Sequence, residues 1–231
     1  STSKIGAASC ADADEICVTD TGSTDETVSA LLQQGVSVQT GFVKPWRWDD
    51  AHNLSLNHLD PTCDVAIRLD LDERLQPNWR EHLEKAWTPD INNLRYKYIW
   101  SWRKNGDPGL VFYCDRIHAR EGFRWSSATH EGLVCWTGEK KQAVSQDLEI
   151  HHFRKQGKRH KSDLFLLSVA VREQPHDARC QWYYARELDY MGDGRTVDEY
   201  KKYLTKEGGT ITETSYALRR LFCLTGEEKF L

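Results

Sequence analysis

The sequence predicts an α/β fold followed by an all-helical C-terminal region. Short apolar runs of strand length alternate with segments of helical period through the N-terminal part of the chain. One of these runs, residues 65–69, leads directly into three carboxylates. From Ser162 onward the spacing of apolar residues changes from two to about 3.6, the period of an α-helix.

Composition and charge are those of a globular protein. The 231 residues are 39% hydrophobic and 29% charged. A formal net charge of -4 provides no overall attraction for nucleic acid or an anionic membrane. The seven cysteines are scattered without a Cys-x-x-Cys pair, so neither a disulfide framework nor a zinc knuckle is predicted. We expect a cytoplasmic protein with no signal peptide and no membrane span.

The first βα unit is predicted from a strand at 16–20 and a tight turn at Gly22. Ser23 and Glu26 have the spacing of a capping box, which predicts a helix from there to Gly35. Asp20 then lies at the carboxyl end of a strand, beside free N–H groups suited to the polar groups of a nucleotide. An ordinary turn, in which Asp20 and Asp25 only satisfy local backbone, is the alternative.

A second helix is predicted to begin at Asp49 or Asp50 and to end before Pro61. It leads to the strand at 65–69, after which Asp70, Asp72 and Glu73 follow. Carboxylates at the end of a strand favour Mg²⁺ or Mn²⁺, which proteins hold by one or two carboxylates together with substrate phosphates. A solvated acidic loop is the commoner meaning of Asp-x-Asp alone.

Beyond the acids, the pattern predicts a helix near Pro77 that packs through Trp79, Leu83 and Trp87, and then a hairpin. The hairpin strands lie at 94–102 and 110–113. Alternate aromatic residues of the first strand indicate burial, with a base or sugar platform as the alternative.

Titratable residues come at the ends of the later strands. His130 and Glu131 precede an apolar run at 133–136, and a strand at 148–153 ends on His151 and His152. Each histidine is a metal ligand, a partner for a carboxylate or a surface imidazole. The basic run at 154–161 is a solvated linker or a diphosphate contact. Thr196 with Glu199 is a second capping box within the helical tail.

Taken in order, these pieces resemble family 2 glycosyltransferases of the GT-A fold, in the bacterial and phage subgroup with a tetratricopeptide-like helical extension. The matching segments are 18–27, 46–53, 69–73 with Pro77, 125–131, 151–152 and the tail from Pro175. The resemblance implies a Rossmann-like mixed sheet flanked by helices, with a catalytic domain at 1–153 and a helical extension at 154–231.

The resemblance also implies roles for residues. Asp70 and Asp72 form the Asp-x-Asp site, with Asp72 toward the metal and His152, or His151, as a further ligand. Glu131, after His130, is the implied general base. The implied contacts to the donor nucleotide are Asp20, Thr21, Asp25, Asn53, Asp70, Lys155 and Arg159. Because negative charge builds on the departing diphosphate, Lys155, Lys158 and Arg159 are also expected to supplement the metal.

The implied reaction is an inverting transfer from a nucleoside-diphosphate sugar, foremost a UDP-sugar, assisted by Mn²⁺ or Mg²⁺. The acceptor stays open among a lipopolysaccharide or other glycan, a peptide and a modified base of phage DNA, so nucleic acid is included as a partner. Oligomeric state is left open. The location is the cytoplasm of a bacterium, or of the host for a phage protein.

Two departures from the family pattern matter. The family opens with an apolar strand carrying an Asn-Glu pair, which is not found in residues 1–13, and its loss is expected to expose a sheet edge. His52 stands where the family usually has arginine. Other classes are a non-catalytic module that binds sugar nucleotides and a nucleotidyltransferase, which would release pyrophosphate.

Overall fold

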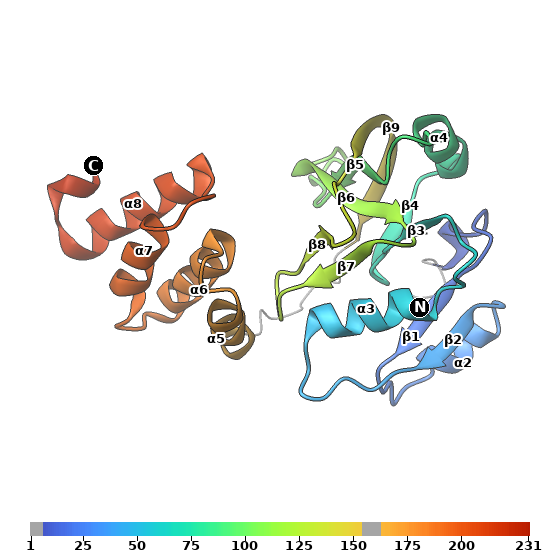
Figure 1. Cartoon of the computed structure of the whole chain (residues 1–231), viewed down its shortest axis with the longest axis horizontal. Coiled ribbons are helices and arrows are strands. Elements are labelled where there is room, and N and C mark those ends of the chain that lie inside the picture. The colour runs from blue at the N-terminus through green and yellow to red at the C-terminus, as the bar shows by residue number, and fades with distance from the viewer. Residues whose placement is uncertain (1–6, 154–162) are drawn as a thin grey trace. The chain divides into compact units, whose positions relative to one another are not determined.

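A computed structural model describes residues 7–153 and 163–231, which divide into two compact units. Unit 1 contains 7–46, 50–126 and 133–153, and unit 2 contains 47–49, 127–132 and 163–231. Unit 1 is a mixed α/β domain, and the helices α5 to α8 form an all-helical C-terminal region (Figure 1). The predicted mixed α/β class with an all-helical C-terminal region is confirmed.

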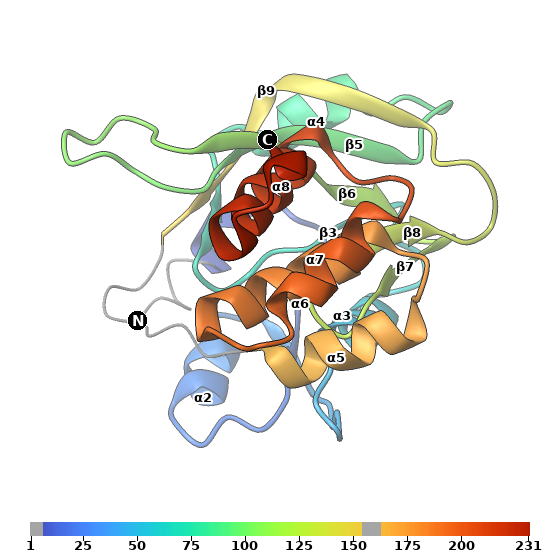
Figure 2. The same cartoon turned by 90° about the vertical axis from the view of Figure 1, so that its left-hand side faces the viewer.

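Unit 1 is built on a curled five-stranded sheet with the strand order β3-β6-β5-β9-β4. The β5 and β9 strands run parallel, and the other neighbours are antiparallel. Figure 2 shows β9, β5 and β6 side by side. The strands are β3 (Val65–Ile67), β4 (Glu73–Leu75), β5 (Asn93–Ile99), β6 (Val111–Ala119) and β9 (Gln142–His152).

Two smaller sheets complete the strands of unit 1. The parallel pair β1 (Cys17–Asp20) and β2 (Ser37–Thr40) forms one, and β7 (Phe123–Ser126) with β8 (Gly132–Cys135) forms the other. Since β1 belongs to a two-stranded sheet and β3 ends the five-stranded one, each has one edge without a partner strand in the described part of the chain. The helices here are α2 (Thr27–Leu32), α3 (Trp48–His58) and α4 (Trp79–Ala86).

The main core of unit 1 lies between the sheet and α4. Leu94, Tyr96, Ile117, Leu148 and Ile150 are completely buried, and Trp79 and Leu83 pack against them from α4. Burial of the alternate aromatic residues Tyr96 and Tyr98 confirms that this face of β5 is core and not a binding platform. Trp100, which follows β5 and continues the same alternation, is 42% exposed.

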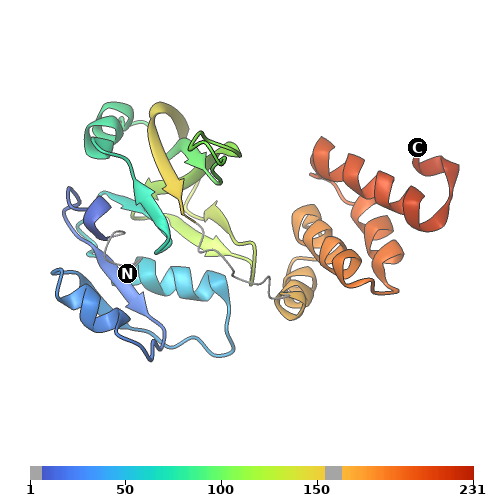
Figure 3. The same cartoon turned by 180° about the vertical axis from the view of Figure 1, so that it is seen from behind.

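The helices of unit 2 pack on one another in sequence order (Figure 3). Tyr200, Tyr203, Ala217 and Leu221 form its core. The helices are α5 (Leu164–Glu173), α6 (Ala178–Met191), α7 (Thr196–Leu204), α8 (Ile211–Thr225) and the 3₁₀ turn η1 (Glu228–Phe230). Among the helices of both described segments, none has the length and apolar character needed to cross a bilayer.

Three helices begin at other residues than predicted, and a specific hydrogen bond is found at each start. The α2 helix begins at Thr27 and not at Ser23, because the Ser23 N–H is taken by the Asp20 carboxylate. The α3 helix already begins at Trp48, ahead of both predicted caps, and the Trp48 N–H bonds the Ala128 carbonyl.

In α7, Thr196 is the first helical residue and donates its hydroxyl to Asp193, so no capping box forms there. The capping box in this region belongs to Thr210 and Glu213 of α8, where the sequence analysis predicted none.

A buried histidine makes the stability of unit 1 depend on pH. His118 on β6 is 1% exposed, and its Nδ1 lies 2.8 Å from the Ala119 carbonyl oxygen, which only accepts. Burial lowers the pKa of His118 because the charged form is desolvated. As pH falls through about 6.5, the unfolded chain gains a proton that the folded chain does not, so the free energy of unfolding decreases.

We therefore expect His118→Gln to weaken the loss of stability between pH 7.5 and pH 5, measured by urea unfolding. His176→Gln, at an exposed histidine of unit 2, is the matched control and should keep the parent slope. Equal slopes for all three proteins would contradict the assignment.

Candidate functional site

The acidic segment forms a tight connection between β3 and β4. The Glu73 N–H donates to the Asp70 carbonyl at 2.9 Å, and the Asp70 N–H donates to the Glu73 carboxylate at 2.8 Å. This turn separates the three carboxylates. Glu73 is drawn into the core at 1% exposure, whereas the side chains of Asp70 and Asp72 are 46% and 30% exposed.

Asp70 is held by arginines. Its carboxylate lies 2.9 Å from Arg68 Nη2 and 3.6 Å from Arg116 Nη1. Arg68 also reaches His52, whose Nε2 lies 2.7 Å from its Nη2, and its guanidinium lies over the Trp125 ring. His52 therefore positions an arginine.

Arg116 joins the site to the core. Its Nη2 lies 2.6 Å from Glu73 Oε1, and its Nε donates to the Tyr96 hydroxyl at 3.2 Å. Burial opposes the charge of Arg116, but Tyr96, Glu73 and Asp70 outweigh burial and raise its pKa. Arg116 thus stays charged behind the acidic turn, at a position that the sequence analysis missed.

Asp72 faces a histidine instead of an arginine. Pairing of β4 with β9 sets Glu73 opposite His152, which brings His152 Nε2 to 3.5 Å from Asp72 Oδ2. His152 Nδ1 lies 3.0 Å from the Trp100 carbonyl oxygen, and the imidazole stacks on the Trp100 ring. A carbonyl only accepts, so Nδ1 must donate, and in the neutral imidazole the lone pair of Nε2 faces Asp72.

Two acceptors that face each other at this distance need a positive partner between them. A proton on Nε2 is one solution, and a divalent cation bound by both side chains is the other. Within residues 7–153 and 163–231, no group of three or more His, Cys, Asp or Glu side chains is arranged to hold a metal. An ion held by Asp72 and His152 would have to take its other ligands from water and from a bound phosphate, as Mg²⁺ and Mn²⁺ do.

The other candidates for this metal are placed differently. The Nε2 atom of His151 lies 3.0 Å from Glu149 and its ring packs edge-on against Trp102, so His151 pairs with a carboxylate of its own strand. Asp70, which the resemblance also implied as a ligand, has its carboxylate directed to arginines. Of the two predicted aspartates, Asp72 is the one beside a histidine.

The predicted nucleotide contacts on β1 satisfy local backbone. Asp20 accepts hydrogen bonds from the N–H groups of Gly22 and Ser23 at 3.1–3.2 Å, and Asp25 accepts from Thr27 at 3.0 Å. The hydrogen bonds from Ser23, with a smaller contribution from Gly22, lower the pKa of Asp20 against the opposing effect of desolvation. The N–H groups of Gly22, Ser23 and Thr27 are thus occupied, and exposed Thr21 lies within the same turn.

Asn53 connects α3 to β7. Its side chain accepts from the Trp125 N–H at 2.8 Å and donates to the Trp125 carbonyl at 2.9 Å, which ties α3 to β7. The carbonyl and the NH₂ group of the Asn53 amide thus both form hydrogen bonds within the protein. Lys155, Lys158 and Arg159, the remaining predicted donor contacts, lie outside the described residues.

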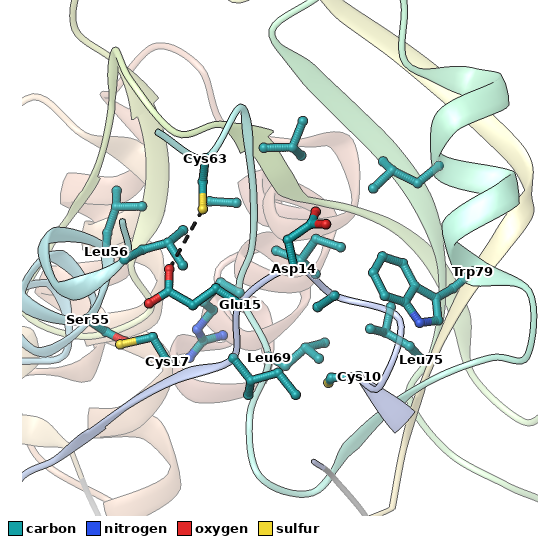
Figure 4. A pocket seen from close by; sticks show the side chains of 18 of the residues that line it. Cys10, Asp14, Glu15, Cys17, Ser55, Leu56, Cys63, Leu69, Leu75 and Trp79 are labelled. Atoms are coloured by element: carbon teal, nitrogen blue, oxygen red, sulfur yellow. Dashed lines mark hydrogen bonds between the residues drawn. The ribbon is translucent and has the colours of Figure 1, made fainter. Parts of the chain in front are cut away.

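A cavity of about 870 Å³ lies beside the acidic turn. Its walls include β1, β3 and α4, and Arg68, Asp70, His52 and Trp125 lie along them. Figure 4 shows side chains that line it, among them Glu15 before β1, Cys17 of β1 and Trp79 of α4. The volume is that of a pocket for a small molecule.

The proposed base belongs to unit 2. His130 adopts a left-handed backbone with φ 52°, and its ring stacks face to face on Tyr183 of α6, with 3.7 Å between centroids and 4° between planes. Glu131 follows it and is half-buried. The stack therefore holds the segment that contains Glu131 against α6.

Comparison of the sequence with protein-family models and with curated proteins finds no match.

Arg68 and Arg116 were not among the predicted site residues. A charged residue inside the apolar run at 65–69 was a visible signal for Arg68. No local signal marks Arg116, because its partners lie on β4 and β5 and meet it only through strand pairing.

Proposed function

We propose that the protein is a metal-dependent, inverting glycosyltransferase of the GT-A type that uses a nucleoside-diphosphate sugar. The observation that supports this most is the pair of Asp72 and His152, with Nε2 directed at the carboxylate by the Trp100 carbonyl. Histidine with carboxylate is a donor set that Mn²⁺ accepts readily. When bound, the ion neutralises charge on the departing diphosphate.

The chain's own residues supply the remaining requirements of the reaction. The acceptor oxygen forms a bond to the anomeric carbon while the bond from that carbon to the diphosphate oxygen breaks, and the electron pair leaves with the diphosphate. Glu131 takes the proton of the acceptor hydroxyl. Arg68 and Arg116 keep Asp70 and the acidic turn in place, and positive charge beside a leaving diphosphate stabilises the transition state.

The cavity beside Asp70 supports a donor of this size. It lies next to the arginine-held acid, and its volume of about 870 Å³ falls in the range of pockets that bury most of a small ligand. We place the nucleotide part of the donor there, with its diphosphate toward Asp72 and His152.

The test combines donor binding with transfer. A thermal-shift panel of UDP-, GDP- and CDP-sugars, each with and without Mn²⁺, should show a rise in melting temperature with one donor only when the metal is present. Glu131→Gln should keep that rise and reduce transfer by roughly 10²- to 10⁴-fold, the usual contribution of a general base.

Each outcome separates the competing classes. Donor binding without transfer in the parent protein would favour a non-catalytic module, and release of pyrophosphate would favour a nucleotidyltransferase. Near-normal transfer by Glu131→Gln would move the base to another residue. If no donor changes the melting temperature, the proposal is wrong.

A further inference from the structure

Unit 2 has a face of aromatic rings and arginines on α6 that extends to α8. On α6 these residues recur every three or four positions, so they lie on one side of the helix. We name this surface the α6 face; it consists of Arg179, Trp182, Tyr183, Arg186 and Tyr190 from α6 with Tyr216 and Arg219 from α8.

Arg186 is at the centre of the α6 face. Its guanidinium carbon lies 4.5 Å from the Trp182 ring centroid, 4.7 Å from that of Tyr183 and 5.6 Å from that of Tyr190. Arg179 lies over Tyr183 at 5.3 Å, which places a second guanidinium on the same ring. Stacking fixes the plane of a guanidinium and leaves the N–H groups at its edge for hydrogen bonds.

Polar atoms of the α6 face lack acceptors. Arg186 Nε and Trp182 Nε1 are buried, and neither has a hydrogen-bond partner within the described part of the chain. No carboxylate there forms an ion pair with Arg179, Arg186 or Arg219, although thirteen other lysines and arginines of the described residues do. The positive charge of these three arginines is thus not neutralised by a carboxylate of the described residues, so a ligand with an anionic group gains by pairing with it.

Charge argues for a small anionic ligand over a nucleic acid. Residues 163–231 contain ten lysines and arginines against twelve aspartates and glutamates, so this region has no extended basic surface. Nucleic-acid binding depends on many phosphate contacts along a basic groove. A few arginines next to flat rings instead suit one anionic group attached to a ring-shaped, partly apolar body.

We propose that the α6 face binds a saccharide that carries a phosphate or carboxylate group. The sugar rings pack on Trp182 and Tyr190, and the anionic group bonds Arg186 and Arg179. This inference rests on the proposed function, in which the saccharide is the acceptor. The stack of His130 on Tyr183 supports it, since Glu131 is the next residue in the chain.

The experiment uses the whole chain, with EDTA and without donor. Binding of maltose 1-phosphate, maltose and inorganic phosphate is measured by calorimetry and by the change in tryptophan fluorescence. We expect the sugar phosphate to bind at least about tenfold more tightly than either of the others, and Arg186→Gln to lose at least about tenfold. Tyr190→Ala, at a side chain 61% exposed, is the second variant and should also weaken binding.

Arg172→Gln is the matched control, because Arg172 is an exposed arginine on α5 outside the α6 face. Equal binding of inorganic phosphate and the sugar phosphate, or unchanged binding by both Arg186→Gln and Tyr190→Ala, would overturn the inference. So would tight binding of single-stranded oligonucleotides in place of the sugar phosphate. Donor binding in Mn²⁺ tests the proposed function separately, so either can fail alone.

Discussion

Replacement of Asp72 by asparagine is expected to abolish the Mn²⁺-dependent rise in melting temperature with the sugar-nucleotide donor. Asparagine keeps the shape of the side chain but removes the negative charge that faces His152 Nε2 at 3.5 Å. Loss of outer-shell partners alone typically costs about 10- to 100-fold in metal affinity, and loss of a direct ligand should cost at least as much. Mn²⁺ titration followed by electron paramagnetic resonance measures the affinity.

Two further variants make this prediction specific. His152→Gln removes the other proposed ligand and should lose Mn²⁺ binding to a similar degree. Asp147→Asn is the control, because Asp147 is an exposed aspartate of the same unit that pairs with Lys85 at 3.3 Å. If Asp72→Asn binds Mn²⁺ as the parent protein does, the metal lies elsewhere.

Replacement of Glu73 by glutamine is expected to cause the largest loss of stability in unit 1. The Glu73 carboxylate accepts from Arg116, from the Tyr98 hydroxyl and from the Asp70 N–H, and its side chain is completely buried. Removing one member of a buried ion pair leaves the other charge uncompensated and costs about 3–5 kcal/mol. Urea unfolding should report this loss, with a fall in melting temperature of about 10 °C.

Glu84→Gln is the matched control for the Glu73 variant. Glu84 forms an exposed pair with Arg80 at 2.6 Å one turn away on α4. Surface pairs of this kind contribute about 0–1 kcal/mol, so the control should stay close to the parent protein. A similar small loss in both variants would show that Arg116 does not depend on Glu73.

Local patterns predicted most elements but not their first residues. Alternation of apolar residues predicted β5 and its hairpin with β6, and the helical period predicted the tail, because both signals repeat over several residues. Helix starts depend on single hydrogen bonds. Asp20 takes the Ser23 N–H, and this contact moves the start of α2 to Thr27.

For the candidate site, the sequence indicated which residues to consider and left their partners open. Asp70 and Asp72 are equivalent in the Asp-x-Asp pattern, yet Asp70 meets two arginines and Asp72 meets His152. His151 and His152 are adjacent, but alternate side chains of a strand point to opposite faces, so only one of them faces the acidic turn.

By itself, the sequence determined the mixed α/β class, the carboxylates at the end of β3 and the helical character of residues from α5 onward, because periodicity and strand ends are local properties of a chain. Tertiary structure alone decided the partners. Pairing of β4 with β9 brings His152 to Asp72, and pairing of β6 with β5 and β3 brings Arg116 behind Asp70 and Glu73. These contacts depend on strand pairing between distant segments, which short-range patterns do not encode.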